Sequence, residues 1–239
     1  MMKRNNFPFS AVLGLNHAKT AILIVLVNPR AGGLLISGPR GIGKSTLMRS
    51  TQELIERPWR DIPVSVTEDR LFGTIDTEKA IYSGQKKLYP GIINEADQGV
   101  LYLDDANLLR EDLLDSILNI AEVGAYQLER DGLSLRCDTS FTVIAAINPE
   151  SGMLSGACLD QFGLFVNVDN IHDENTRVEI LKRTISFEKD CASFCNLWKL
   201  ENEKIKKAIH SAMSLLPKVV VSSAMIQLAS VYALKAHVS

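Results

Sequence analysis

The segment that most constrains the fold is residues 38–45, GPRGIGKS, which fits the phosphate-loop pattern G-x-x-x-x-G-K-[ST] without a mismatch. The apolar run at 33–37 predicts a buried strand before it, and residues 46–50 predict the start of a helix after it. In that context, backbone N–H groups and the positive end of the helix converge on a phosphate. A glycine-rich turn before an ordinary helix is the alternative, which the Lys44-Ser45 pair disfavours. The segment therefore predicts a nucleotide-binding α/β domain.

The phosphate loop assigns nucleotide contacts to individual residues. We expect Lys44 to reach the β- and γ-phosphates during catalysis, and the Ser45 hydroxyl to join the shell of Mg²⁺. ATP and Mg²⁺ are therefore the expected cofactors. The residues of this segment expected to bind the nucleotide are Gly38, Pro39, Arg40, Gly41, Ile42, Gly43, Lys44, Ser45 and Thr46.

Two further apolar runs end in polar side chains. Residues 99–103 read as a strand buried on both faces and are followed by Asp104 and Asp105. We expect Asp104 to orient the Mg²⁺ hydration shell and Asp105 to position or deprotonate the attacking water, although an acidic helix cap would look similar. The run at 141–147 ends at Asn148, a candidate catalytic residue whose amide would contact that water or the γ-phosphate. The Asn-Pro pair found there is also a common turn.

Composition narrows the partners and the compartment. A net charge of −2 over 239 residues creates no broad field for nucleic acid or an anionic membrane, so neither is an expected partner. The apolar run at 21–27 is shorter than the roughly 20 residues that span a bilayer, and the N-terminus does not read as a signal peptide. We expect a cytoplasmic protein, or a stromal one in a plastid. Cys191 and Cys195 could form half a metal site on a helix, but reduced structural thiols fit better without further ligands.

The order of the patterns predicts two domains. From residue 33 to about 169, strands alternate with helices, which predicts a parallel sheet between two helical layers. An Asp131-Gly132 pair predicts an inserted β-hairpin near residues 124–137. From residue 172 onward the segments 175–187, 203–216 and 222–235 read as helices. We therefore expect an α/β domain over residues 1–171 and a small, incomplete, all-helical lid domain over 172–239.

Taken together, these residues resemble the I subunit of magnesium chelatase, an AAA+ P-loop ATPase of the helix-2-insert group. The matching stretches are residues 7–14 (FPFSAVLG), 67–76 (TEDRLFGTID), 89–96 (YPGIINEA) and the insert at 129–134. The resemblance implies that Val12, Leu13 and Gly14 border the adenine. It also implies a hexameric ring that hydrolyses ATP at subunit interfaces. Its expected partners are a D-type AAA+ subunit with an integrin-type domain and a large porphyrin-binding H-type subunit. That H-type subunit inserts Mg²⁺ into protoporphyrin IX, a ligase reaction of porphyrin metabolism and chlorophyll biosynthesis.

Three departures from the family suggest a degenerate or truncated member. The family carries Glu where this chain has Asp105, and its presumed arginine finger stands where this chain has Gln161. The helix of the family's sensor-2 arginine would follow Ser239. We therefore expect Mg·ATP binding to be retained and hydrolysis to be attenuated. The alternatives are a non-catalytic ATP-binding ring or regulatory subunit, and a MoxR-type chaperone for another metal cofactor.

Overall fold

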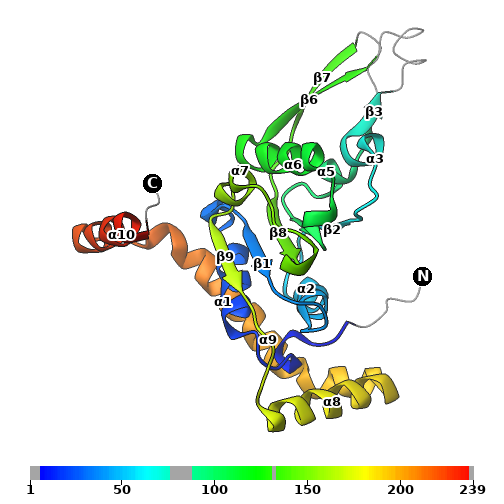
Figure 1. Cartoon of the computed structure of the whole chain (residues 1–239), viewed down its shortest axis with the longest axis vertical. Coiled ribbons are helices and arrows are strands. Elements are labelled where there is room, and N and C mark those ends of the chain that lie inside the picture. Colours follow the sequence, from blue (N-terminus) through cyan, green and yellow to red (C-terminus); the bar gives the residue numbers. More distant parts are fainter. Residues whose placement is uncertain (1–5, 76–87, 131–132, 237–239) are drawn as a thin grey trace.

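A computed structural model describes residues 6–75, 88–130 and 133–236. Its centre is a five-stranded sheet of order β2-β5-β8-β1-β9, in which every neighbouring pair is parallel (Figure 1). The strands are β1 (Leu34–Ser37), β2 (Trp59–Ile62), β5 (Val100–Leu103), β8 (Thr142–Ile147) and β9 (Leu164–Asn167). The predicted α/β fold with a parallel sheet is confirmed.

Helices cover both faces of this sheet because successive strand side chains point to opposite sides. Leu35, Leu101 and Val143 face one hydrophobic cluster, whereas Leu34 and Ile144 face the other. The first cluster is completed by α3 (Glu68–Phe72), α5 (Ile92–Glu95), α6 (Glu111–Val123) and α7 (Gly156–Asp160), and the second by α1 (Asn16–Val27), α2 (Lys44–Thr51) and α9 (Cys191–Leu215). The result is the three-layer arrangement expected from the sequence.

In the described ranges, two antiparallel strand pairs and several 3₁₀ turns lie outside the central sheet. Strand β3 (Gly73–Ile75) pairs with β4 (Leu88–Pro90), and β6 (Ala125–Arg130) pairs with β7 (Leu133–Asp138). The turn predicted at Asp131-Gly132 lies outside the described residues, but the strands on either side run antiparallel from Ala125↔Asp138 to Arg130↔Leu133. The 3₁₀ turns are η1 (Phe9–Ala11), η2 (Pro29–Ala31), η3 (Gln52–Leu54), η4 (Ala106–Leu108), η5 (Pro149–Ser151) and η6 (Leu216–Lys218).

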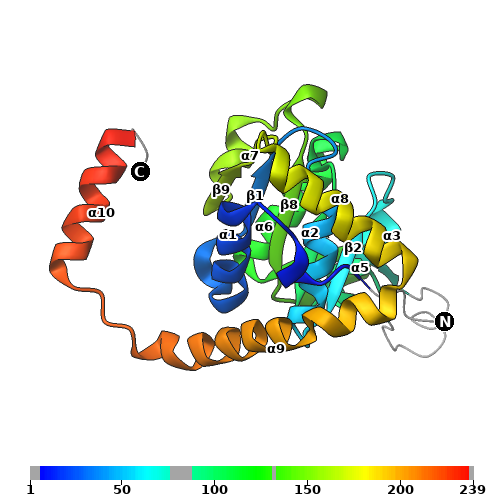
Figure 2. The ribbon, with the colours of Figure 1, turned by 90° about the horizontal axis from the view of Figure 1, so that it is seen from below.

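In the part of the chain that the structure describes, three helices follow the sheet. Two of them, α8 (Glu174–Lys189) and α10 (Ser223–Ala236), occupy the predicted ranges to within two residues, whereas α9 begins at Cys191 instead of residue 203. The Asp190 side chain accepts a hydrogen bond from the Ser193 N–H at 3.0 Å and caps this earlier start. Figure 2 shows α9 running along the α/β body and α10 standing away from it. The domain boundaries at 171 and 172 stay a prediction.

Candidate functional site

The phosphate loop joins the carboxyl end of β1 to the first residue of α2. Gly43 caps α2 with a φ of 93°, a left-handed conformation that favours glycine because it has no Cβ. Lys44 is buried, and its Nζ donates hydrogen bonds to the carbonyl oxygens of Gly38 at 2.6 Å and Pro39 at 2.8 Å. The loop therefore holds an ammonium group directly beside the N-terminus of a helix.

Two carboxylates lie close to this ammonium group. Asp104 and Asp105 follow β5, which reaches the same edge of the sheet as β1 because both strands pair in parallel with β8. Burial lowers the pKa of Lys44, while the negative charges of Asp105 and Asp104 act in the opposite direction. Asp105 has a φ of 49°, in the left-handed region that aspartate tolerates better than most residues. The lysine and the two acids predicted from sequence thus form one cluster.

Tyr102 on β5 adds a polar group that sequence reasoning missed. Burial, reinforced by the neighbouring Asp104 carboxylate, raises the pKa of its phenol, so the side chain is neutral. The hydroxyl lies beside Asp104 and Ser45, but no described residue forms a hydrogen bond with it. Hydroxyl and carboxylate oxygens are the ligands that Mg²⁺ prefers, and an unpaired phenol suits a metal-bound water. These residues therefore fit a hydrated Mg²⁺ ion.

Asn148 lies at the same edge, at the end of β8, and is buried. Its Nδ2 donates to Ser151 Oγ at 3.2 Å, and its Oδ1 accepts a hydrogen bond from the Glu150 N–H at 3.2 Å. Asn107 Nδ2 donates to the Asn148 carbonyl oxygen at 3.1 Å. The Asn148 amide thus stabilises the local turn in this structure, and its contact with a water or the γ-phosphate stays a prediction.

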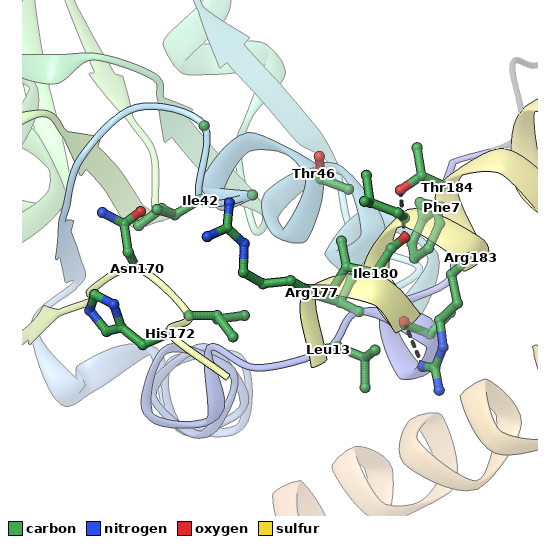
Figure 3. A pocket seen from close by; sticks show the side chains of 16 residues that line it. Phe7, Leu13, Ile42, Thr46, Asn170, His172, Arg177, Ile180, Arg183 and Thr184 are labelled. Atoms are coloured by element: carbon green, nitrogen blue, oxygen red, sulfur yellow. Dashed lines mark hydrogen bonds between the residues drawn. The ribbon is translucent and has the colours of Figure 1, made fainter. Parts of the chain in front are cut away.

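A cavity of about 650 Å³ opens beside the phosphate loop (Figure 3). It is enclosed by the N-terminal segment, the loop and α8. The predicted binding residues that line it are Val12, Leu13, Gly41, Ile42, Gly43 and Thr46. Gly14 lies against Ile171, which also lines the cavity. The residues predicted to border the adenine and those of the phosphate loop therefore meet around one space.

Three basic residues of the cavity, which follow β9 in the chain, were not identified from the sequence. His172 precedes α8, and Arg177 and Arg183 belong to it; all three line the cavity. Figure 3 shows the Arg177 side chain extending toward Ile42 of the phosphate loop. No local pattern marks these residues, because their proximity to the loop depends on how α8 packs.

Gln161 lies before the amino end of β9, whereas the phosphate loop follows the carboxyl end of the neighbouring strand β1. It caps the C-terminal end of α7 and precedes β9, which pairs in parallel with β1 in the register Leu34↔Leu164. The phosphate loop begins four strand residues further along, about 13 Å away at the usual rise of 3.3 Å per residue. A second cavity, of about 560 Å³, is lined by Gln161, Asp160 and Arg30 among others. Gln161 therefore lies away from the phosphate loop of its own chain and lines a different cavity.

The remaining expectations concern metals and membranes. Among the described residues, no group of three or more His, Cys, Asp or Glu side chains could hold a metal ion. Burial, followed by the neighbouring Cys191, raises the pKa of the Cys195 thiol to about 12. Within the described ranges, no single helix is long and apolar enough to cross a membrane. The pair Cys191–Lys218 and Ser223–Lys235, bent by 104°, reaches that length and composition only when taken together.

Comparison with known proteins gives consistent similarities. Residues 33–161 match the family model of the AAA domain (dynein-related subfamily). The magnesium-chelatase 38 kDa subunit of Rhodobacter capsulatus is 35% identical, over 89% of this chain and 70% of that protein. The magnesium-chelatase subunit ChlI of Synechocystis is 32% identical over 92% of this chain and 72% of its own length. A solved structure of the complex between subunits BchI and BchD of magnesium chelatase matches with a TM-score of 0.66 and 35% identity, over 90% of this chain and 77% of the other.

Proposed function

Because this chain belongs to the AAA-domain family of magnesium-chelatase I subunits, we propose that it binds Mg·ATP and drives a partner chelatase subunit. The observation that carries this proposal is the cluster of Lys44, Ser45, Asp104 and Asp105 beside a cavity of about 650 Å³. That volume falls within the range of small-molecule and cofactor sites. The apolar Val12 and Leu13 that line this cavity suit an adenine base.

Each residue of the cluster has a distinct role in this proposal. Lys44 exchanges its bonds to loop carbonyls for the β- and γ-phosphates, where its charge is better compensated. Ser45 and Asp104 would hold a Mg²⁺ ion, and the unpaired Tyr102 hydroxyl would donate a hydrogen bond to water bound to that ion. A Mg²⁺ ion bound there would neutralise phosphate charge. Asp105 orients the attacking water and accepts its proton.

We propose that this chain retains Mg·ATP binding but hydrolyses ATP slowly. The Asp105 carboxylate is one methylene shorter than a glutamate at the same position, so it reaches less far toward the attacking water. A misplacement of about 1 Å can cost about 10²-fold in rate. Gln161 is neutral, and it cannot compensate the charge that develops on a neighbour's γ-phosphate. Turnover therefore depends on help from a partner subunit.

The proposed assembly is the one that membership of the magnesium-chelatase I subunits implies. The chain forms a ring, taken to be hexameric, in which ATP lies between subunits. It associates with a D-type subunit, in keeping with its similarity to the BchI–BchD complex. A large porphyrin-binding H-type subunit then inserts Mg²⁺ into a tetrapyrrole, in the cytoplasm or the plastid stroma. The I subunit supplies conformational work and does not touch the porphyrin.

Lys44→Ala tests the nucleotide site. We expect it to weaken Mg·ATP binding by roughly 1.5–3 kcal/mol, because a charge-assisted contact with the β- and γ-phosphates is lost. Arg49→Ala is the matched control, since Arg49 is exposed on the same helix α2. Isothermal titration calorimetry measures both. Equal affinities for the wild type and Lys44→Ala would show that ATP binds elsewhere or not at all.

A non-catalytic ATP-binding ring is the second candidate function. It is favoured by the neutral Gln161 and by the Asn148 amide, whose two polar atoms are both bonded within the local turn. In this case ATP would order an assembly without being consumed. Steady-state hydrolysis by the purified protein distinguishes the two candidates. A turnover near about 1 s⁻¹ would rule out the non-catalytic ring.

A further inference from the structure

The side chains that line the cavity beside the phosphate loop carry charge of one sign only. Among its sixteen residues are Arg177, Arg183 and His172, and none is an aspartate or a glutamate. The rest are mainly apolar or glycine. A ligand with an anionic part and an apolar part suits such a lining, because the anionic part can contact the arginines and the apolar part can contact the apolar side chains.

The two arginines of the cavity differ in what they already bind. Arg183 Nε donates to Glu179 Oε1 at 2.9 Å, its NH1 donates to the Ala11 carbonyl oxygen at 2.9 Å, and its guanidinium lies 4.6 Å from the centre of the Trp198 ring. No described residue forms an ion pair or a side-chain hydrogen bond with the Arg177 guanidinium, and this side chain is exposed. Arg177 is therefore the cation that is available to a ligand.

The position of Arg177 indicates which part of a ligand it meets. Figure 3 shows its side chain extending from α8 toward Ile42, while Gly41, Ile42 and Gly43 all line the same cavity. The backbone N–H groups of a phosphate loop cradle the α- and β-phosphates, whereas the loop lysine reaches the β- and γ-phosphates. A guanidinium that extends from α8 toward Ile42 is thus directed to the α/β side of the phosphate chain.

Helix α8 is held in place by aromatic contacts with the rest of the protein. Phe187 of α8 lies 5.2 Å from the ring of Phe7 and 5.7 Å from that of Phe194 on α9, measured between ring centres. Arg177 therefore belongs to a helix that is anchored at Phe187, near its C-terminal end. Arg and phosphate form strong, geometrically specific pairs, and fewer degrees of freedom are lost when the cation is presented from a fixed element.

We propose that Arg177 binds the α- and β-phosphates of the nucleotide in its own subunit and so connects α8 to the bound nucleotide. This inference rests on the proposed nucleotide-binding function. It adds a binding residue that comes from the helical region of the chain. Since ADP carries both phosphates, ADP and ATP should depend on Arg177 to the same degree.

Calorimetric titration with Mg·ADP and Mg·ATP tests the proposal on the full chain. We expect Arg177→Ala to weaken both affinities about tenfold or more, as expected for a hydrogen-bonded ion pair. Arg177→Lys should lie between Arg177→Ala and the wild type, because lysine keeps the charge but not the planar fork. The matched control is Lys182→Ala, which removes an exposed cation of the same helix that does not line the cavity. It should bind like the wild type.

Several outcomes would overturn the proposal. Wild-type affinity in Arg177→Ala would do so, as would a loss in Lys182→Ala of the same size, or a loss in Arg177→Lys as large as in Arg177→Ala. A loss confined to ATP would place the guanidinium on the γ-phosphate instead. Circular dichroism checks that each variant is folded. If the wild type binds neither nucleotide, the proposed function itself fails, which is a separate result.

Discussion

Asp105 suits the backbone turn that it occupies better than it suits the positioning of an attacking water. Its backbone has φ 49° and ψ 48°, and its carbonyl oxygen accepts a hydrogen bond from the Leu108 N–H at 2.8 Å. Aspartate is among the residues that adopt this left-handed conformation most readily. The backbone is therefore compatible with Asp105, while the shorter side chain limits how far its carboxylate reaches.

Asp105→Glu is expected to raise the rate of Mg·ATP hydrolysis by up to about 10²-fold, because the longer side chain restores roughly 1 Å of reach. Affinity for Mg·ATP should change little, since Asp105 is not assigned to the metal or the phosphates. Phosphate-release kinetics measures the rate, and calorimetry measures the affinity. An unchanged or lower rate in a folded variant would mean that the reach of this carboxylate does not limit turnover.

At the scale of single residues, the sequence predicted the positions of those side chains that are set by residues next to them in the chain. Lys44 and Ser45 are fixed by one loop, and Asp104 follows directly from the strand before it. Tyr102 was missed because an aromatic residue in an apolar strand reads as core. Arg177 was missed because nothing local shows which helix packs over the phosphate loop.

Among the elements, the pairing of β1 with β9 depends on a close backbone approach. The Gly163 N–H donates to the Gly32 carbonyl oxygen at 2.8 Å, and the Leu164 N–H donates to the Gly33 carbonyl oxygen at 3.1 Å. A Cβ on Gly163 would lie 1.7 Å from the Ala31 carbonyl oxygen. Because that neighbour is backbone, it cannot turn aside as a flexible side chain could. Glycine at 163 thus allows the edge strand to join the sheet.

Gly163→Ala is expected to lower the free energy of unfolding by about 1–3 kcal/mol, the usual cost of overpacking. Gly156→Ala is its matched control, since a Cβ there meets nothing within 4 Å and Gly156 is the first residue of α7. The control should be neutral or stabilised by up to about 1 kcal/mol. Urea denaturation followed by tryptophan fluorescence compares the two. Equal free energies of unfolding for the two variants would show that the backbone around Gly163 and Ala31 moves apart at no cost to make room for the added methyl group.

Element prediction succeeded where burial imposes a pattern and failed where helix ends depend on caps. The continuous apolar runs identified β5 and β8 because strands covered on both faces carry few polar residues. The start of α9 was expected at residue 203, whereas the Asp190 cap marks the true beginning of this helix at Cys191. The place of α10 could not be predicted, because its apolar side chains, such as Ile226 at 60% exposure, find no cover in the structure.

For the whole molecule, the sheet topology decides how Gln161 can act. The phosphate loop and Gln161 lie at opposite ends of adjacent parallel strands, β1 and β9. Any contact between Gln161 and a bound nucleotide must therefore cross to another subunit. A nucleotide shared in this way stabilises the assembly by linkage, so Mg·ATP should promote self-association. Light scattering with and without Mg·ATP reports that association.

Gln161→Arg is expected to raise turnover per subunit, because a cation supplied from a neighbour stabilises transition-state charge and is typically worth about 10³–10⁵ in rate. Since the cation acts in a second subunit, the gain should appear only at protein concentrations where light scattering shows assembly. Binding of Mg·ATP should change little, because the ground state already has Lys44 and the helix N-terminus. Phosphate release measured across a dilution series separates these effects.

Mixing two variants tests whether the gain crosses between subunits. A subunit with Gln161→Arg and Lys44→Ala lacks its own phosphate contact, yet it still presents an arginine to its neighbour. Added to wild-type subunits, it should raise their turnover, whereas subunits with Lys44→Ala alone should dilute it. Arg30 lines the same cavity as Gln161, so Arg30→Ala in the Gln161→Arg background checks that the new cation and not Arg30 causes the gain. If Gln161→Arg leaves turnover unchanged in an assembly that light scattering shows to be complete, this edge of the sheet does not face a neighbour's nucleotide. The catalytic charge must then come from a different surface. The parallel direction of β1 and β9 already excludes a contact between Gln161 and the phosphate loop of the same chain.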